Sequence, residues 1–92
     1  MESREAFGKV LQSVRKQQCL TQQVLADQAV VERNYISRIE LGKSCPSVCV
    51  VFKICAVLRV PPSAMLARVE ELIRSSPETR QAKQARPLTR RR

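Results

Sequence analysis

The sequence contains no histidine and no tryptophan, and only two of its 92 residues are glycine. Without histidine, no nucleophile in the chain has its usual activating base. The isolated Gly8 and Gly42 cannot form a glycine-rich loop that cradles phosphates. Glu70 and Glu71 are neighbours on a predicted helix and point about 100° apart, so they do not form a catalytic carboxylate pair. We therefore predict that the protein is not an enzyme and needs no cofactor.

Long apolar runs are also missing. No stretch approaches the roughly 18–20 residues that cross a bilayer, and the first residues, MESREAF, carry acidic side chains where a signal peptide has positive ones. We therefore expect a cytoplasmic protein with no membrane partner.

The four cysteines are expected to be free thiols in a reducing compartment. Cys49 and Cys55 lie about 240° apart around a predicted helix, so they cannot share one metal ion. Cys45 and Cys49 could come close, but two thiolates without histidine make an incomplete zinc site. Cys55 fits a buried position in which cysteine acts as a small apolar residue. We predict no metal site, and redox or metal sensing by Cys19, Cys45, Cys49 or Cys55 stays an open alternative.

Positive charge is abundant and uneven. The chain has a net charge of +9 and a pI near 10.3, which favours a polyanionic partner such as nucleic acid. Residues 1–74 carry 11 basic and 7 acidic side chains, whereas residues 75–92 carry 6 basic and 1 acidic. Residues 76–92 contain one leucine and no aromatic residue, too little to build a core. We predict a folded domain over 1–75 and a disordered basic tail over 76–92, which serves either solubility or phosphate contact.

Apolar periodicity predicts an all-α domain of five helices. They are expected at residues 3–17, 22–29 after a Thr21 cap, 32–41 before Gly42, 48–58 after a Ser47 cap, and 62–75 with a proline in its first turn. The β-branched run at the start of 48–58 would also suit a strand, but its helical neighbours favour a helix. This segment has one charge in eleven residues, which predicts burial on more than one side.

The segments 22–29 and 32–41, joined by a tight link, have the pattern of a helix-turn-helix, whose second helix enters the DNA major groove. At these positions the chain resembles the phage-repressor (Cro/Xre) family, over roughly residues 5–73. The matching residues are Arg15, Leu20, Thr21, Gln22, Leu25, Ala26, Val31, Ile36, Ser37, Arg38, Ile39, Glu40, Gly42, Lys43, Pro46, Ser47, Ile54 and Leu58. Residues 33–37 are similar to the small controller proteins of restriction-modification systems.

The resemblance implies a five-helix, lambda-repressor-like domain that binds double-stranded DNA as a homodimer, in a bacterial or phage-encoded protein associated with the nucleoid. It implies base readout by Glu32, Arg33, Asn34, Tyr35, Ser37 and Arg38, and phosphate contact by Gln22, Gln23 and Lys43. Gln22 would also brace the second helix of the motif. An ion pair of Arg15 with Glu40 would link the first and third helices. The chemistry fits, since arginine can bind guanine and asparagine adenine through paired hydrogen bonds.

Two residues depart from the family pattern in the turn. Val30 stands where the family usually has glycine, and Glu32 stands where it has a small helix cap. Because a β-branched residue is disfavoured at positive φ, the sequence predicts that the turn follows a different backbone path.

The apolar helix at 48–58 and the last helix predict self-association. The last helix offers Met65, Leu66, Val69, Leu72 and Ile73 to a two-fold dimer, with help from the end of 48–58. The predicted function is a sequence-specific transcriptional regulator, a dimeric repressor of a palindromic operator. The alternative is a protein-interaction module, such as an antitoxin or an adaptor, that uses the last two helices.

Overall fold

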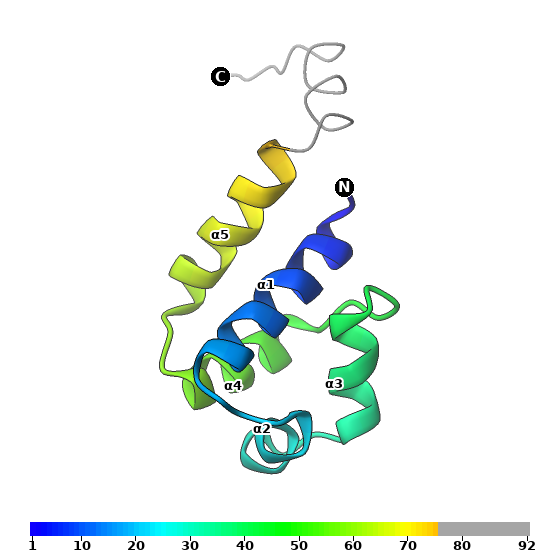
Figure 1. The fold of residues 1–92 in the computed structure, drawn as a ribbon, viewed down its shortest axis with the longest axis vertical. Coiled ribbons are helices and arrows are strands. Elements are labelled where there is room, and N and C mark those ends of the chain that lie inside the picture. The colour runs from blue at the N-terminus through cyan, green and yellow to red at the C-terminus, as the bar shows by residue number, and fades with distance from the viewer. Residues whose placement is uncertain (76–92) are drawn as a thin grey trace.

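The computed structural model describes residues 1–75, which form five helices and no strand (Figure 1). The helices are α1 (Ser3–Gln17), α2 (Gln22–Ala29), α3 (Arg33–Glu40), α4 (Val48–Leu58) and α5 (Pro62–Arg74). The predicted all-α class is confirmed. Two helices are shorter than predicted, because the residues at their ends are caps: Glu32 and Leu41 flank α3, and Ser75 follows α5. The predicted tail at 76–92 lies outside the described residues.

Side-chain caps determine where two of the short helices begin. The Thr21 hydroxyl accepts a hydrogen bond from the Val24 amide at 3.1 Å, and the Ser47 hydroxyl accepts one from the Val50 amide at 3.1 Å. Each cap satisfies an amide that has no partner inside its helix, which is worth about 1 kcal/mol. α2 and α4 therefore start at the residues that the sequence predicts.

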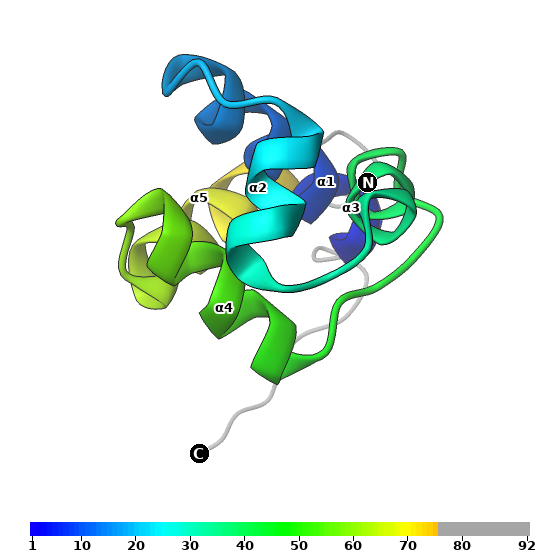
Figure 2. The ribbon, with the colours of Figure 1, turned by 90° about the horizontal axis from the view of Figure 1, so that it is seen from below.

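A single apolar core holds the helices together. α1 runs side by side with α5 in the opposite direction and packs on its other flank against α3, while α2 packs against α3 and α4 (Figures 1 and 2). The fully buried large side chains are Leu11, Leu25, Ile36, Ile39, Ile54, Cys55, Leu58 and Met65. Because α1 contacts both α3 and α5, it fixes the position of the helix-turn-helix relative to the last helix.

One face of α4 stays outside this core. Val48 is 72% exposed and Phe52 is 59% exposed, whereas the opposite side of the helix is buried. The prediction that α4 is buried on more than one side is wrong for the single chain, because its buried residues, Val51, Ile54, Cys55 and Leu58, lie within an arc of about 100° around the helix. No single helix within residues 1–75 is long and apolar enough to cross a membrane, and α4 with α5 reaches that length only as a pair bent by 106°.

Four helices end in the same hydrogen-bonded motif. After α2, the Val31 amide donates to Ala26 O at 2.9 Å and the Val30 amide donates to Asp27 O at 3.3 Å, which is the Schellman pattern. This motif needs one residue in the left-handed region. The residues that take it after α1, α2, α3 and α4 are Cys19 (φ 60°), Val30 (φ 59°), Gly42 (φ 77°) and Arg59 (φ 58°). Only one of these four ends therefore uses glycine.

The turn between α2 and α3 corrects a prediction. Val30 was expected to force another backbone path, but it adopts the left-handed conformation in which the family usually has glycine. Its side chain is 79% exposed, so it meets no crowding from the core. The hydrogen bonds of the turn and the burial of Ala29 outweigh the local strain of about 1–2 kcal/mol.

Replacing Val30 by glycine should raise the free energy of unfolding by about 0.5–1 kcal/mol, because glycine takes this conformation without strain but loses more backbone entropy on folding. Urea denaturation followed by circular dichroism measures the change. Val48→Gly is the matched control, since Val48 is similarly exposed but helical. It should lower the stability. A loss at both positions would show that the turn is not strained.

Candidate nucleic-acid interface

α3 presents one polar face to solvent and one apolar face to the core. Ile36 and Ile39 are fully buried, while Arg33, Asn34 and Arg38 are exposed. At about 100° per residue, the three exposed side chains span an arc of about 140°. Ser37 lies within this arc and is half-buried, whereas Tyr35 is half-buried about 60° beyond it, next to the buried Ile39. Glu32 is exposed just before the helix. The structure thus brings the six residues predicted to read bases onto or beside one surface.

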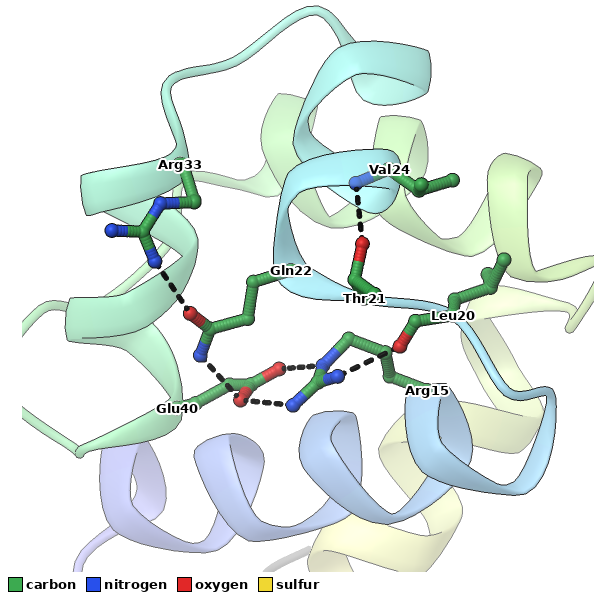
Figure 3. A network of polar contacts seen from close by, with 7 residues as sticks. All are labelled: Arg15, Leu20, Thr21, Gln22, Val24, Arg33 and Glu40. Carbon is green, nitrogen blue, oxygen red and sulfur yellow. Dashed lines mark hydrogen bonds and ion pairs between the residues drawn. The ribbon is translucent and has the colours of Figure 1, made fainter.

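A buried ion pair connects α1 to the C-terminal end of α3. Arg15 Nε donates to Glu40 Oε2 at 2.6 Å and Arg15 Nη2 donates to Glu40 Oε1 at 3.0 Å (Figure 3). Only 1% of the Glu40 side chain is exposed. The hydrogen bond to Glu40 raises the pKa of Arg15, despite the opposing effect of burial. The ion pair predicted between Arg15 and Glu40 is present, and a paired, two-pronged geometry of this kind holds two helices in a defined orientation.

Gln22 extends this ion pair to the polar face of α3. Its Nε2 donates to Glu40 Oε1 at 3.0 Å, and its Oε1 accepts from Arg33 Nη1 at 3.3 Å (Figure 3). Arg15 Nη1 closes the other end by donating to Leu20 O at 2.7 Å, in the link before α2. α1, α2 and α3 are therefore joined by one chain of hydrogen bonds that ends at Arg33. Gln22 braces α3 in the way that the resemblance implies.

The loop after α3 holds the second exposed arginine. Arg38 Nε donates to Ser44 Oγ at 3.1 Å, and the Lys43 and Ser44 amides both donate to Arg38 O, at 2.9 and 3.3 Å. Arg38 is thus oriented by the loop that carries Lys43, which is exposed. Sequence reasoning did not single out Ser44, because a serine in a loop gives no signal of its partner.

The other predicted phosphate contact, Gln23, is engaged within its own helix. Its Nε2 donates to Asp27 Oδ1 at 2.9 Å on the exposed side of α2. Phosphate would have to replace this bond. Gln22 opens α2, so its neighbouring backbone amides lie at the positive end of the helix dipole. Gln22, Gln23 and Lys43 flank the polar face of α3 along the chain, before and after it.

Gly8 is a residue of this site that sequence reasoning missed. It lies inside α1, where a Cβ atom would come within 2.8 Å of Glu40 O and closer still to Ile39 O. Both atoms are backbone atoms of the last turn of α3, so α1 and α3 touch through their main chains. The available signal was the glycine itself, since an isolated glycine inside a helix usually has a packing reason.

The cysteines do not gather around the site. Cys55 is buried, as predicted, and burial raises the pKa of its thiol. Cys19, Cys45 and Cys49 are exposed free thiols. Within residues 1–75, no group of three or more histidine, cysteine or acidic side chains could hold a metal ion.

The residues predicted for the dimer interface do not share one surface. Met65 and Val69 lie in the core of the single chain, with exposures of 0% and 6%. Leu72 is half-buried and lines a groove against α1. Leu66, Ile73 and the buried Val69 line a separate surface groove on α5. The prediction for a dimer therefore narrows to this groove, because Met65 is fully buried in the core and Leu72 faces α1.

Comparisons with known proteins agree with this architecture. Residues 11–65 match the helix-turn-helix family. The transcriptional regulator ClgR of Mycobacterium tuberculosis is 37% identical over 84 residues, which cover 84% of this chain and 75% of the relative. The restriction-modification controller protein C.AhdI from Aeromonas hydrophila has a TM-score of 0.66 at 26% identity, covering 67% of this chain and 94% of that one. The clp gene regulator ClgR from Corynebacterium glutamicum is similar in fold, with a TM-score of 0.78 at 24% identity over 96% of this chain and 98% of that one.

A short helix, a tight turn and a second helix with a free polar face define a helix-turn-helix protein. The family match spans more than half of the chain, so the chain belongs to the helix-turn-helix family of the Xre/Cro type, a family of transcriptional regulators rather than a class of enzymes. The predicted family and fold are confirmed.

Proposed function

We propose that the protein is a sequence-specific binder of double-stranded DNA that represses transcription as a two-fold dimer on a palindromic operator. The observation that carries this proposal is the polar face of α3, which is exposed while its supports are buried. Arg33 and Arg38 are each held by a neighbouring polar side chain, and their guanidinium groups have the donors that read guanine in the major groove.

The residues on either side of α3 suit contacts with the DNA phosphate backbone. Lys43 follows the helix and Gln22 opens the preceding one. In helix-turn-helix complexes such flanking groups bind phosphates and fix the register, whereas the outward side chains of the second helix choose the sequence. We assign base readout to Glu32, Arg33, Asn34, Tyr35, Ser37 and Arg38, and phosphate contact to Gln22, Gln23 and Lys43.

Arg33→Ala and Arg38→Ala should each weaken operator binding by about 1–3 kcal/mol and relax the preference at one base pair of each half-site, because they remove contacts to base edges. The measurement is selection of binding fragments from random DNA, followed by titration of the selected site at fixed salt. The affected base pairs should occur twice, with half-site centres about 10 bp apart or a multiple of that.

Lys43→Ala is the matched control. As a phosphate contact it should weaken binding to every sequence alike and lower the slope of log K against log salt by about 0.9 for each copy, or about 1.8 for the dimer. Circular dichroism must show that each variant is folded. If the two arginine variants lose affinity equally for operator and random DNA, the polar face of α3 is only an electrostatic patch. The result would then favour the alternative function, a protein-interaction module.

For the dimer, we propose a two-fold interface through α5. Leu66 and Ile73 are seven residues apart and lie within about 20° of each other around the helix. Together with Ser63, Ala67, Val69 and Glu70 they line a groove of about 380 Å³. Leu66 is 49% exposed, which leaves a large apolar side chain in water unless a partner covers it. The same surface on a second copy would be self-complementary.

Leu66→Asp and Ile73→Asp should each convert the dimer to a monomer at micromolar concentration, because a carboxylate in an apolar interface loses its hydration. Sedimentation equilibrium measures the mass, and operator titration should show at least a tenfold loss. Val48→Asp is the control, since Val48 is an exposed apolar residue on another helix. A monomeric wild-type chain, or a mass unchanged in the α5 variants, would contradict the interface.

A further inference from the structure

A second groove lies between α1 and α5, away from the surfaces described so far. It has a volume of about 370 Å³, and its lining residues are Lys9, Val10, Ser13, Arg68, Glu71, Leu72 and Ser75. Val10 and Leu72 provide an apolar floor, one from each helix. Lys9 and Arg68 are exposed cations at its edges. The volume is within the range of about 300–1,000 Å³ that is common for ligand pockets.

The groove is separate from the polar face of α3. On α1, Gly8 and Arg15 face α3, and Lys9 and Ser13 lie about 100–160° further around the helix. It is also separate from the proposed dimer surface. On α5, Arg68 lies about 160° from Leu66, and Ser75 lies about 160° from Ile73. A molecule in the groove therefore leaves both the DNA-reading face and the dimer surface free.

Charge decides which kind of molecule fits. Within residues 1–75, neither Lys9 nor Arg68 forms an ion pair, although five other charged residues of α1 and α5 do. Glu71, the one acidic lining residue, lies 3.8 Å from Arg74, which also lies 3.7 Å from Glu70. The groove thus combines an apolar floor with two cations that form no ion pair and one carboxylate that is engaged with Arg74. DNA phosphates would use the cations but leave the floor empty.

We propose that this groove is a docking site for an acidic segment of a partner protein, in which a leucine-like side chain rests on Val10 and Leu72 and carboxylates meet Lys9 and Arg68. The site goes beyond the proposed DNA binding and does not depend on it. The chain's own residues 76–92 start at the groove, after Ser75, but they carry six basic residues and one acidic residue. Their net positive charge matches the charge of Lys9 and Arg68, so by charge an acidic segment is the better occupant.

Fluorescence anisotropy of the full chain with a labelled peptide, EDLEELLDED, tests the site at physiological salt. We expect saturable binding that is lost when the leucines of the peptide are replaced by serine. The double variant Lys9→Gln, Arg68→Gln should weaken binding about tenfold, as expected for two surface charge pairs. Its matched control is the double variant Lys53→Gln, Arg59→Gln. This variant also removes two positive charges, one on α4 and one at its C-terminal cap, and should leave the peptide affinity unchanged.

Three outcomes would overturn the docking site. Absence of peptide binding would do so directly. Equal weakening by the two double variants would mean general attraction to a basic protein. Tighter binding of a peptide with the sequence of residues 76–92 would make the chain's own tail the occupant. Operator titration of the Lys9, Arg68 variant is an independent readout, and it should match wild type. If neither the wild-type chain nor its variants bind DNA, the proposed function is wrong, but the result with the peptide still holds.

Discussion

Glu40→Ala should lower the free energy of unfolding by about 3–5 kcal/mol, which is the usual effect of removing one partner from a buried ion pair. The side chain is 1% exposed and accepts two hydrogen bonds from Arg15 and one from Gln22. Its loss leaves the Arg15 guanidinium buried without a counter-charge. Because small domains are stable by only about 5–15 kcal/mol, much of the chain's stability would be lost. Urea denaturation at neutral pH, followed by circular dichroism, gives the value.

Glu71→Ala is the matched control for this prediction. Glu71 also pairs with an arginine, but the distance to Arg74 is 3.8 Å and both side chains are mostly exposed. Such a surface pair contributes about 0–1 kcal/mol. The double variant Arg15→Met, Glu40→Leu should recover much of the stability lost in Glu40→Ala, since no buried charge remains. Equal effects of Glu40→Ala and Glu71→Ala would mean that the buried pair adds nothing beyond a surface contact.

DNA binding should fall together with stability in Glu40→Ala, but for a different reason. The Glu40 carboxylate holds Gln22, and Gln22 holds Arg33 through its other end. Glu40→Gln keeps the size of the side chain and changes only its charge and one acceptor. It separates the two effects, because loss of operator preference at a temperature where the variant is folded reports the orientation of Arg33.

Local signals in the sequence were enough to predict the helices. Thr21 and Ser47 each cap the following helix, and Pro62 begins α5. The spacing of the apolar residues in α3 also indicated which side of the helix faces the core, so the residues on its outward side could be predicted. These signals act over three or four residues, within the reach of a single helical turn.

Features that depend on distant contacts were harder to predict. Val30 takes a left-handed conformation against its own preference, because the hydrogen bonds of the turn outweigh the strain. Met65 and Val69 have the spacing of an interface on a helical wheel, yet they fill the core under α5. A wheel shows which residues share a face, but it does not show whether the chain's own helices or a second chain covers that face.

The polar site was predictable in part. The pairing of Arg15 with Glu40 and the bracing by Gln22 followed from a resemblance to a known family, since no spacing rule connects residues 25 positions apart. The contact of Arg38 with Ser44 depends on how the loop after α3 folds back. Neither residue type specifies that path.

Gly8→Ala should have the second large effect, a net loss of about 2 kcal/mol in the free energy of unfolding, because a backbone clash lies at the upper end of the usual cost of overpacking. Alanine is favoured over glycine inside a helix by about 1 kcal/mol, so without a steric conflict the variant would be more stable. Here the new methyl group would lie within 2.8 Å of Glu40 O and 3.0 Å of Glu40 C. These are backbone atoms, so relief requires α1 and α3 to separate, and overpacking of this kind costs about 1–3 kcal/mol or more.

Gly42→Ala distinguishes this steric effect from a general intolerance of glycine substitution. Gly42 has φ 77°, and its added Cβ would lie 3.1 Å from Glu5 Cγ, which belongs to a flexible side chain. We expect a loss of about 1 kcal/mol from the backbone conformation alone. Gly8→Ala should also weaken operator binding in the molecules that remain folded, because α3 would move away from α1 and strain the ion pair of Arg15 with Glu40 that orients α3. A stable Gly8→Ala variant with wild-type operator affinity would show that α1 and α3 do not touch through their backbones, and that the position of α3 is set by its side chains.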